Sequence, residues 1–134
     1  MRYLLDTNIC IYLLNDYPPQ VLARFKGIPL GDVQISVVTY AELRHGIERC
    51  PAEDRIAADH ALQRFVARVP VLPFDEQAAQ NYGVLAAAVR DRNRDTMDRL
   101  IAAHALSVGV TLVTNNEADF KDYPGLVLEN WSVS

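Results

Sequence analysis

A carboxylate interrupts the first apolar stretch of the chain. Asp6 lies between Tyr3-Leu4-Leu5 and Ile9-Cys10-Ile11, in a segment typical of a buried strand followed by a helix. A buried, unpaired carboxylate costs several kcal/mol. We therefore expect Asp6 to lie at the end of a structural element, to accept hydrogen bonds there, or to bind a cation.

Three further acids fall at comparable positions. Glu42 lies in the first turn after the second expected strand, Asp98 in the first turn of a strongly apolar helix, and Asp119 just beyond the fourth strand. All four can converge at the carboxyl edge of one parallel sheet, where such sheets bind ligands. Carboxylates so close together repel one another unless cations bind them, and Mg²⁺ or Mn²⁺, which prefer oxygen ligands, are the obvious candidates.

Acids that bind divalent cations, without a glycine-rich loop for a nucleotide, suggest metal-assisted hydrolysis of phosphodiester bonds. In that chemistry the metal lowers the pKa of the attacking water and stabilises charge on the scissile phosphate. No nucleophilic constellation competes, because neither Cys10 nor Cys50 is paired with a suitable histidine. His104 lies inside the apolar helix and is expected to be a hydrogen-bonded core residue, whereas His45 and His60 are expected at the surface.

Each acid also has a structural explanation. Thr39-Tyr40-Ala41-Glu42 matches a helix capping box. An acid near a helix N-terminus, such as Asp98, is stabilised by about 0.3–1 kcal/mol. Asp119 lies in a loop in which Glu117 or Asp122 could take its place. Asp6 has the fewest alternatives.

The elements that must position these acids alternate along the chain. Strands are expected at residues 2–5, 33–38, 69–72, 110–114 and 126–128, and helices at 8–14, 20–26, 39–50, 51–69, 75–89 and 97–108. The expected helix caps are Asn8, Thr39, Asp75 and either Asp95 or Thr96. This alternation predicts an α/β fold: an α/β/α sandwich whose central, mostly parallel sheet has about five strands.

Length and composition fit a single domain over residues 1–134. Hydrophobic residues make up 50% of the chain and charged residues 22%, as in globular proteins. The net charge of −4 argues against a general electrostatic grip on nucleic acid but permits a local basic surface. Isolated cysteines and the lack of a membrane-spanning run indicate a reduced, cytoplasmic protein.

Taken in order, these motifs resemble the PIN-domain family, and more narrowly the VapC toxins of bacterial type II toxin–antitoxin pairs. The resemblance covers essentially the whole chain. The motifs that carry it are Asp6-Thr7-Asn8, Ala41-Glu42-Leu43, residues 98–105, Leu112-Val113-Thr114-Asn115-Asn116 with Asp119-Phe120, Pro124-Gly125-Leu126 and Glu129-Asn130-Trp131.

The resemblance implies a Mg²⁺- or Mn²⁺-dependent endoribonuclease that a cognate VapB antitoxin holds silent. It assigns the catalytic, metal-binding roles to Asp6, Glu42, Asp98 and Asp119, and supporting places to Asn8, Thr114 and Asn116. It further implies a homodimer, an RNA substrate that could be transfer RNA, and contact with DNA only through the antitoxin. The competing functions are a structure-specific DNA nuclease of the same fold and a non-catalytic module that binds RNA or protein.

The turn before Asp98 departs from the family pattern. Related toxins usually have Gly-Pro-x-Asp there, whereas this chain has Asp95-Thr96-Met97-Asp98. The change could shift Asp98, and Asp95 adds an acid that could reach a second metal.

Arginines surround two of the four acids, and they could contact RNA phosphates or simply balance charge at the surface. The candidates for RNA contact are Arg44, Arg49, Arg92, Arg94 and Arg99.

Overall fold

The first strand of the chain lies in the middle of the sheet. The computed structural model describes residues 2–90 and 95–133. The five strands are β1 (Tyr3–Leu5), β2 (Val33–Ser36), β3 (Val71–Leu72), β4 (Thr111–Val113) and β5 (Leu128–Glu129). They are arranged in the order β3-β2-β1-β4-β5, and every neighbouring pair is parallel. This confirms the predicted sheet, although the strands are shorter than expected and β5 begins two residues late.

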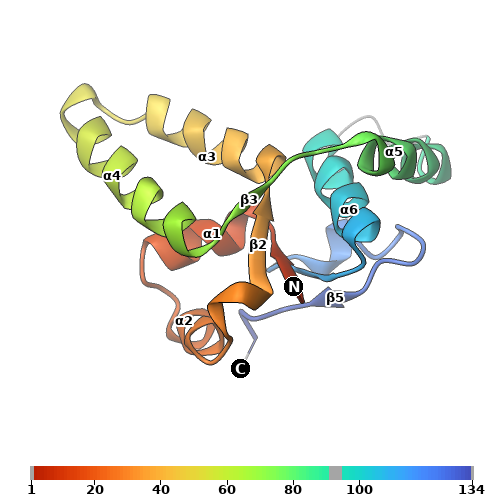
Figure 1. Cartoon of the computed structure of the whole chain (residues 1–134), viewed down its shortest axis with the longest axis horizontal. Coiled ribbons are helices and arrows are strands. Elements are labelled where there is room, and N and C mark those ends of the chain that lie inside the picture. Colours follow the sequence, from red (N-terminus) through yellow and green to blue (C-terminus); the bar gives the residue numbers. More distant parts are fainter. Residues whose placement is uncertain (1, 91–94, 134) are drawn as a thin grey trace.

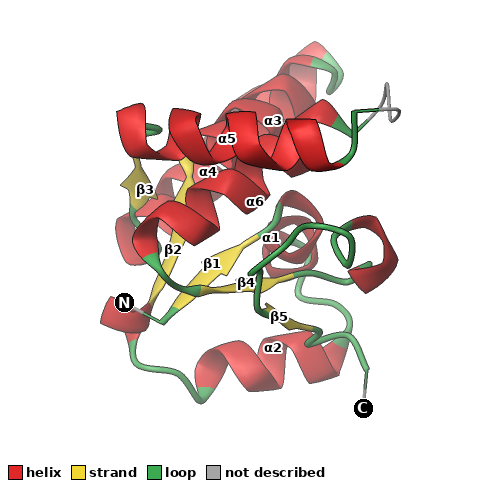
Figure 2. Ribbon diagram, turned by 90° about the vertical axis from the view of Figure 1, so that its right-hand side faces the viewer, coloured by secondary structure: helices red, strands yellow, loops and turns green. Residues whose placement is uncertain are grey.

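Helices cover both faces of the sheet (Figures 1 and 2). The helices are α1 (Thr7–Leu14), α2 (Pro19–Lys26), α3 (Val37–Glu48), α4 (Ala52–Arg68), α5 (Glu76–Ala88) and α6 (Thr96–Val108). Two short 3-10 helices, η1 (Leu30–Asp32) and η2 (Glu117–Asp119), complete the described elements. Helices α1 to α4 lie on one side of the sheet and α5 and α6 on the other, which confirms the α/β/α sandwich.

Alternate residues of β1 belong to different halves of the core. Tyr3 and Leu5 pack with residues of α1 to α4, whereas Leu4 packs with residues of α5 and α6. Successive side chains of a strand point to opposite faces, so a fully buried strand is apolar throughout. Helix α6 is buried between the sheet and α5, as its apolar sequence predicts.

Two helices begin differently from the sequence expectation. Asp6, not Asn8, caps α1, and its carboxylate accepts a hydrogen bond from the Ile9 N–H at 3.0 Å. Ser36 caps α3 by accepting from the Val38 N–H at 3.0 Å, so the helix starts inside the expected strand. The capping-box interpretation of Thr39 and Glu42 is therefore wrong.

Other helix ends follow the expectation. Asp75 caps α5 and accepts from the Ala78 N–H at 3.0 Å. Gly109 ends α6 with φ +70°, a conformation that glycine adopts without steric cost. Among the described residues, none of the helices combines the length and apolarity that a membrane crossing requires.

We expect opposite effects from alanine at two glycines. A Cβ on Gly109 meets nothing within 4 Å, so only the positive φ of this residue opposes a side chain. Gly109→Ala should therefore lower the free energy of unfolding by about 1–2 kcal/mol. Gly83 lies in the middle of α5 on its exposed side, and a Cβ there also meets nothing within 4 Å. Gly83→Ala should therefore raise the free energy of unfolding by about 0.5–1 kcal/mol, because alanine favours the helix more than glycine does. Urea unfolding of both variants measures these changes. Shifts of the same sign would contradict the assigned conformations.

Candidate active site

Asp6 is held at the carboxyl end of the central strand. Its backbone N–H donates to the Val113 carbonyl of β4 at 2.9 Å, and its carboxylate caps α1. The Thr114 hydroxyl donates a further hydrogen bond to the carboxylate. Asp6 is only 5% exposed. Burial raises its pKa from 3.8 to about 6, even though these hydrogen bonds favour the charged form.

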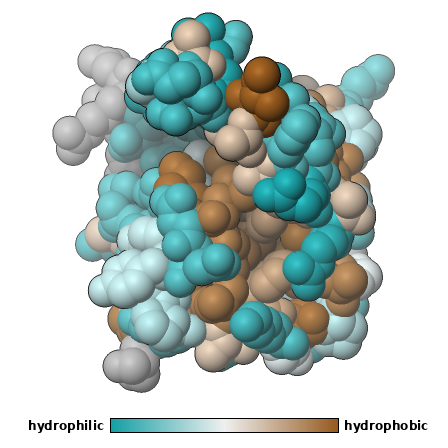
Figure 3. Space-filling view, turned by 90° about the vertical axis from the view of Figure 1, so that its left-hand side faces the viewer, coloured by the Kyte–Doolittle hydropathy of each residue, from teal (hydrophilic) through white to brown (hydrophobic). Residues whose placement is uncertain are grey.

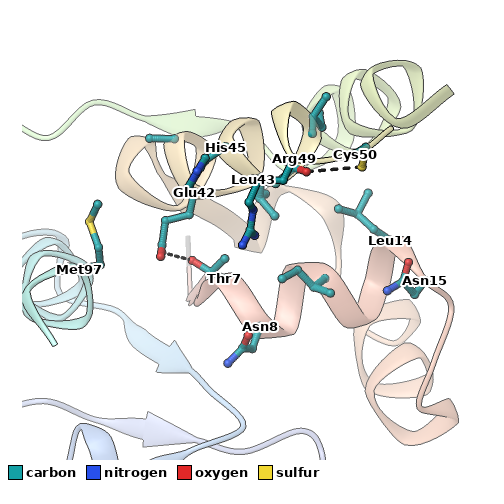
Figure 4. A pocket seen from close by; sticks show the side chains of 14 residues that line it. Thr7, Asn8, Leu14, Asn15, Glu42, Leu43, His45, Arg49, Cys50 and Met97 are labelled. Atoms are coloured by element: carbon teal, nitrogen blue, oxygen red, sulfur yellow. Dashed lines mark hydrogen bonds between the residues drawn. The ribbon is translucent and has the colours of Figure 1, made fainter. Parts of the chain in front are cut away.

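Glu42 reaches the same edge from α3. Its carboxylate accepts a 2.5 Å hydrogen bond from the Thr7 hydroxyl in the first turn of α1 (Figure 4). This bond orients Glu42 beside Asp6, whose pKa its negative charge raises further. Sequence reasoning did not single out Thr7. The only available signal was its place directly after Asp6, and the bond joins residues far apart in the chain.

Asp98 approaches from the other layer of helices, in the first turn of α6. Its pKa is raised to about 6, first by burial and then by negative charges around it. Those charges come, largest effect first, from Asp119, Asp6, Asp95 and Glu42. All four predicted acids therefore share one electrostatic environment. Such clustering of raised carboxyl pKa values is typical of functional sites.

The unusual turn before Asp98 keeps a glycine-like backbone. Asp95 has φ +69° and ψ +26°, the left-handed conformation that aspartate tolerates better than most residues. The aspartate thus occupies the conformation that the glycine of Gly-Pro-x-Asp would favour. Asp98 keeps its place in the first turn, while the Asp95 charge adds to the repulsion at the site.

Asp119 and two supporting residues form the far side of the site. Thr114 is fully buried at the end of β4 and accepts from the Asn116 N–H at 3.0 Å. The Asn116 side-chain amide donates to the Asp119 carboxylate at 2.8 Å. Asn116 therefore orients Asp119, as its proposed supporting role requires.

An amide network surrounds Asn8 at the edge of the site. Its side chain donates to the Asn115 side-chain carbonyl at 3.4 Å, and Asn115 in turn donates to the Tyr12 hydroxyl at 3.0 Å. Asn8 is exposed and points away from Thr7 and Glu42 (Figure 4). In its position it can contact a ligand directly.

The acids surround one region without forming a ready-made ligand set. Within residues 2–90 and 95–133, no three His, Cys, Asp or Glu side chains are arranged so that they could hold a metal ion.

The buried Cys10 thiol has a pKa raised well above its usual value, chiefly by burial. A thiolate nucleophile is therefore disfavoured there.

The candidate arginines have different environments. Arg44 forms an ion pair with Asp59 of α4, and Arg49 is exposed at the end of α3. Arg99 is only 6% exposed and donates to the Thr96 hydroxyl at 3.2 Å, so little of it can contact RNA as it stands. Arg92 and Arg94 lie outside the described residues. The expected surface positions of His45 and His60 are confirmed.

A groove of about 600 Å³ leads to Thr7 and Glu42 between α1 and α3. Figure 3 shows apolar surface along a hollow on this side of the molecule, bordered by polar side chains. The apolar part of this α1–α3 groove comprises Ile11, Leu14, Leu43, Ile47 and, across it on α6, Met97. Arg49 lies at the groove too, so its lining carries charges of both signs.

Comparisons with known proteins agree with this fold along almost the whole chain. A model of the PIN domain matches residues 3–126. The tRNA(fMet)-specific endonuclease VapC of Shigella flexneri is 37% identical, over 98% of this chain and 99% of the relative. Ribonuclease VapC2 of Rickettsia felis is 33% identical, over 98% of each chain. The solved structure of DNA-bound VapBC from Salmonella typhimurium contains a chain with a TM-score of 0.88, 33% identity and 98% coverage of both chains.

The raised carboxyl pKa values predict how stability depends on pH. The folded, metal-free protein holds the Asp6 and Asp98 protons more tightly than the unfolded chain does. Their stabilising contribution is therefore complete below about pH 4 and lost as the pH rises through about 6. Asp6→Asn keeps the helix cap and removes one of these groups. The free energy of unfolding of this variant, relative to that of the wild type, should therefore rise by on the order of 2 kcal/mol between pH 4 and pH 7.

Urea unfolding at both pH values measures this difference. Asp16→Asn is the control, because Asp16 is exposed beyond the opposite end of α1. An Asp6→Asn variant that follows the wild-type pH dependence, as the control should, would contradict the assigned environment of Asp6.

Proposed function

Because the chain belongs to the PIN-domain family, within its VapC group, we propose that it is a toxin endoribonuclease. Residues 1–134 form a single PIN domain that hydrolyses RNA phosphodiester bonds in the cytoplasm. The observation that carries this proposal is the shared environment of the four acids at the carboxyl edge of the sheet. Asp6 and Asp98, from opposite helical layers, both have pKa values of about 6 there.

A divalent cation, Mg²⁺ or Mn²⁺, fits the chemistry of the donors at this site, and the acids of the described residues would have to come closer together to share it. Burial is the largest cause of both raised pKa values, and neighbouring carboxylates raise them further, so a bound cation would favour the charged forms of these acids. Carboxylate oxygens are the ligands these ions prefer. Asp6, Glu42, Asp98 and Asp119 would hold the cation. When bound, it would supply an activated water and charge stabilisation at the scissile phosphate.

The residues of the chain itself orient the acids. The Thr7 hydroxyl donates to one Glu42 oxygen, Oε1, and the second oxygen of the carboxylate would be available to the cation. The Thr114 hydroxyl and the Ile9 N–H fix Asp6, and the Asn116 amide fixes Asp119. Orientation by hydrogen-bonded neighbours lowers the cost of assembling the site around RNA.

The substrate is RNA, and the Shigella flexneri relative supports transfer RNA as a candidate because its name specifies tRNA(fMet). Asn8 and Arg49 are exposed and line the α1–α3 groove, which supports a proposed contact of both with a bound strand. We also propose that the protein forms a homodimer, as its family resemblance implies.

A VapB-type antitoxin is the proposed inhibitor. Relatives at 31–33% identity occur in VapBC complexes, two of them bound to DNA. The α1–α3 groove suits an amphipathic antitoxin segment, because apolar side chains line it and Glu42 lies at its end. An antitoxin arginine could pair with the acids there. Contact with DNA would then come through the antitoxin.

The cleavage mechanism predicts a strict dependence on cation and acids. RNA cleavage should require Mg²⁺ or Mn²⁺ and stop in EDTA. Asp6→Asn and Asp98→Asn should each lower kcat at least about 100-fold, because each removes a ligand charge. Single-turnover assays on end-labelled RNA measure these effects, with Asp16→Asn as the matched control.

Undiminished cleavage by both site variants, folded by circular dichroism, would rule out the assigned mechanism. A DNA substrate of the same sequence separates the competing nuclease function, since preferential DNA cleavage would overturn the RNA assignment. Mn²⁺ titration calorimetry with RNA present tests the non-catalytic alternative, which predicts no metal binding.

The antitoxin proposal predicts a localised loss of affinity. Ile11 lines the groove and is 40% exposed, so Ile11→Lys should raise the antitoxin Kd at least about tenfold by placing a charge on an apolar contact. Ile56 is 72% exposed on α4 and does not line the groove, so Ile56→Lys is the control. Calorimetric titration with the purified antitoxin measures both values. Equal affinities for the two variants would place the antitoxin elsewhere.

A further inference from the structure

A buried hydrogen bond joins the two helices that carry Glu42 and Asp98. The His104 imidazole of α6 and the Ser36 hydroxyl at the start of α3 lie 2.7 Å apart, measured from Nδ1 to Oγ. Both residues are at most 1% exposed. The bond connects α6 to the junction between β2 and α3, although these segments are far apart in the sequence.

The surrounding hydrogen bonds determine which atom donates. The Pro73 backbone also interacts with the ring as a hydrogen-bond partner that favours the protonated form. Because Nδ1 faces Ser36, we assign this interaction to Nε2, whose N–H would donate to the carbonyl. Burial lowers the pKa of His104, and Asp75, the charged group that acts on the ring, only partly opposes this effect. A neutral ring protonated on Nε2 has an accepting Nδ1, so the Ser36 hydroxyl donates to it.

Ser36 Oγ consequently makes two bonds with different tasks. It accepts from the Val38 N–H, which starts α3, and donates to His104, which belongs to α6. The Phe74 ring packs edge-on against the imidazole, with centroids 5.5 Å apart and planes at 78°, and restricts its rotation. The Ser36–His104 hydrogen bond therefore fixes the start of α3 to the interior of α6.

The Ser36–His104 bond is separated from Glu42 and from Asp98 by the same number of residues. Glu42 follows Ser36 by six residues on α3, and Asp98 precedes His104 by six on α6. Six helical residues span about 9 Å, so a pivot of about 10° at the bond displaces an acid by about 1.5 Å. Misplacement by about 1 Å can cost about 100-fold in rate.

We propose that Ser36 and His104 are positioning residues, which hold α3 and α6 together so that Glu42 and Asp98 face Asp6. The proposal rests on the ribonuclease function proposed above. It assigns His104 a role outside the reacting groups: its ring lies within the core and contacts none of the four acids through the bonds described.

Two amide substitutions separate the halves of this connection. In His104→Asn the side-chain oxygen is attached to Cγ, as Nδ1 is, so it can still accept from Ser36 while the Pro73 bond is lost. In His104→Gln the amide extends to the position of Nε2, which preserves the bond to Pro73 and removes the acceptor for Ser36. His104→Leu removes both bonds, and Ser36→Ala removes the shared hydroxyl.

We expect the Ser36–His104 bond, rather than the bond to Pro73, to determine how Glu42 and Asp98 are positioned. His104→Asn should keep kcat for RNA and Mn²⁺ affinity within about threefold of wild type, whereas His104→Gln should lose at least tenfold in both with little change in KM. Ser36→Ala should resemble His104→Gln. Combining Ser36→Ala with His104→Leu should lower kcat no further than either substitution alone, because the one interaction that both remove, the Ser36–His104 bond, is the one expected to position the acids. Mn²⁺ binding is measured by electron paramagnetic resonance with the metal alone.

Equal losses in His104→Asn and His104→Gln, or independent losses in the double variant, would overturn the proposal. ¹⁵N NMR of the metal-free wild type gives a separate readout: the expected tautomer carries its proton on Nε2, and a proton on Nδ1 would also overturn it. A wild-type protein with this tautomer that neither binds Mn²⁺ nor cleaves RNA would refute the ribonuclease function and, with it, the positioning role. Unchanged activity in His104→Gln would refute the positioning role alone.

Discussion

The burial of a charged group at the end of the central strand is the constraint on which the rest of the structure depends. Asp6 is fixed through its backbone to β4 and through its carboxylate to α1, so the carboxylate cannot turn away to solvent. Its position at the centre of the sheet brings helices from both layers to the same edge. The surrounding hydroxyl and amide donors reduce the cost of the charge but leave its pKa raised.

The sequence was most informative where local chemistry decides the structure. Alternating apolar segments predicted the parallel sheet, and Asp75 and Gly109 marked helix ends correctly because each acts through its own backbone neighbours. The capping box failed because Ser36, which also bonds His104 across the core, starts α3 three residues earlier. Glu42 bonds Thr7 of another helix instead, a contact that no local pattern encodes.

The candidate site joins two parts that pack separately. Asp6 and Glu42 belong with α1 and α3, while Asp98 belongs to α6, which packs in the other half of the core. Sequence spacing could predict that these acids reach one edge, since parallel strands end together. It could not predict their mutual electrostatic effect or the left-handed backbone of Asp95, because both depend on how the two layers meet.

The pairing of β1 with β4 has a consequence for protein synthesis. Tyr3–Leu5 is made first, yet its partner Thr111–Val113 is made after most of the chain. The nascent chain emerges from the ribosome with its N-terminus first. Asp6 therefore emerges long before Thr114 and Asp119, which complete the acidic edge. A translation product that stops before β4 therefore carries Asp6 and Glu42 without a finished site. For a protein proposed to cleave RNA, this order of strands means that a copy ending before β4 lacks both the strand that fixes Asp6 and the fourth acid.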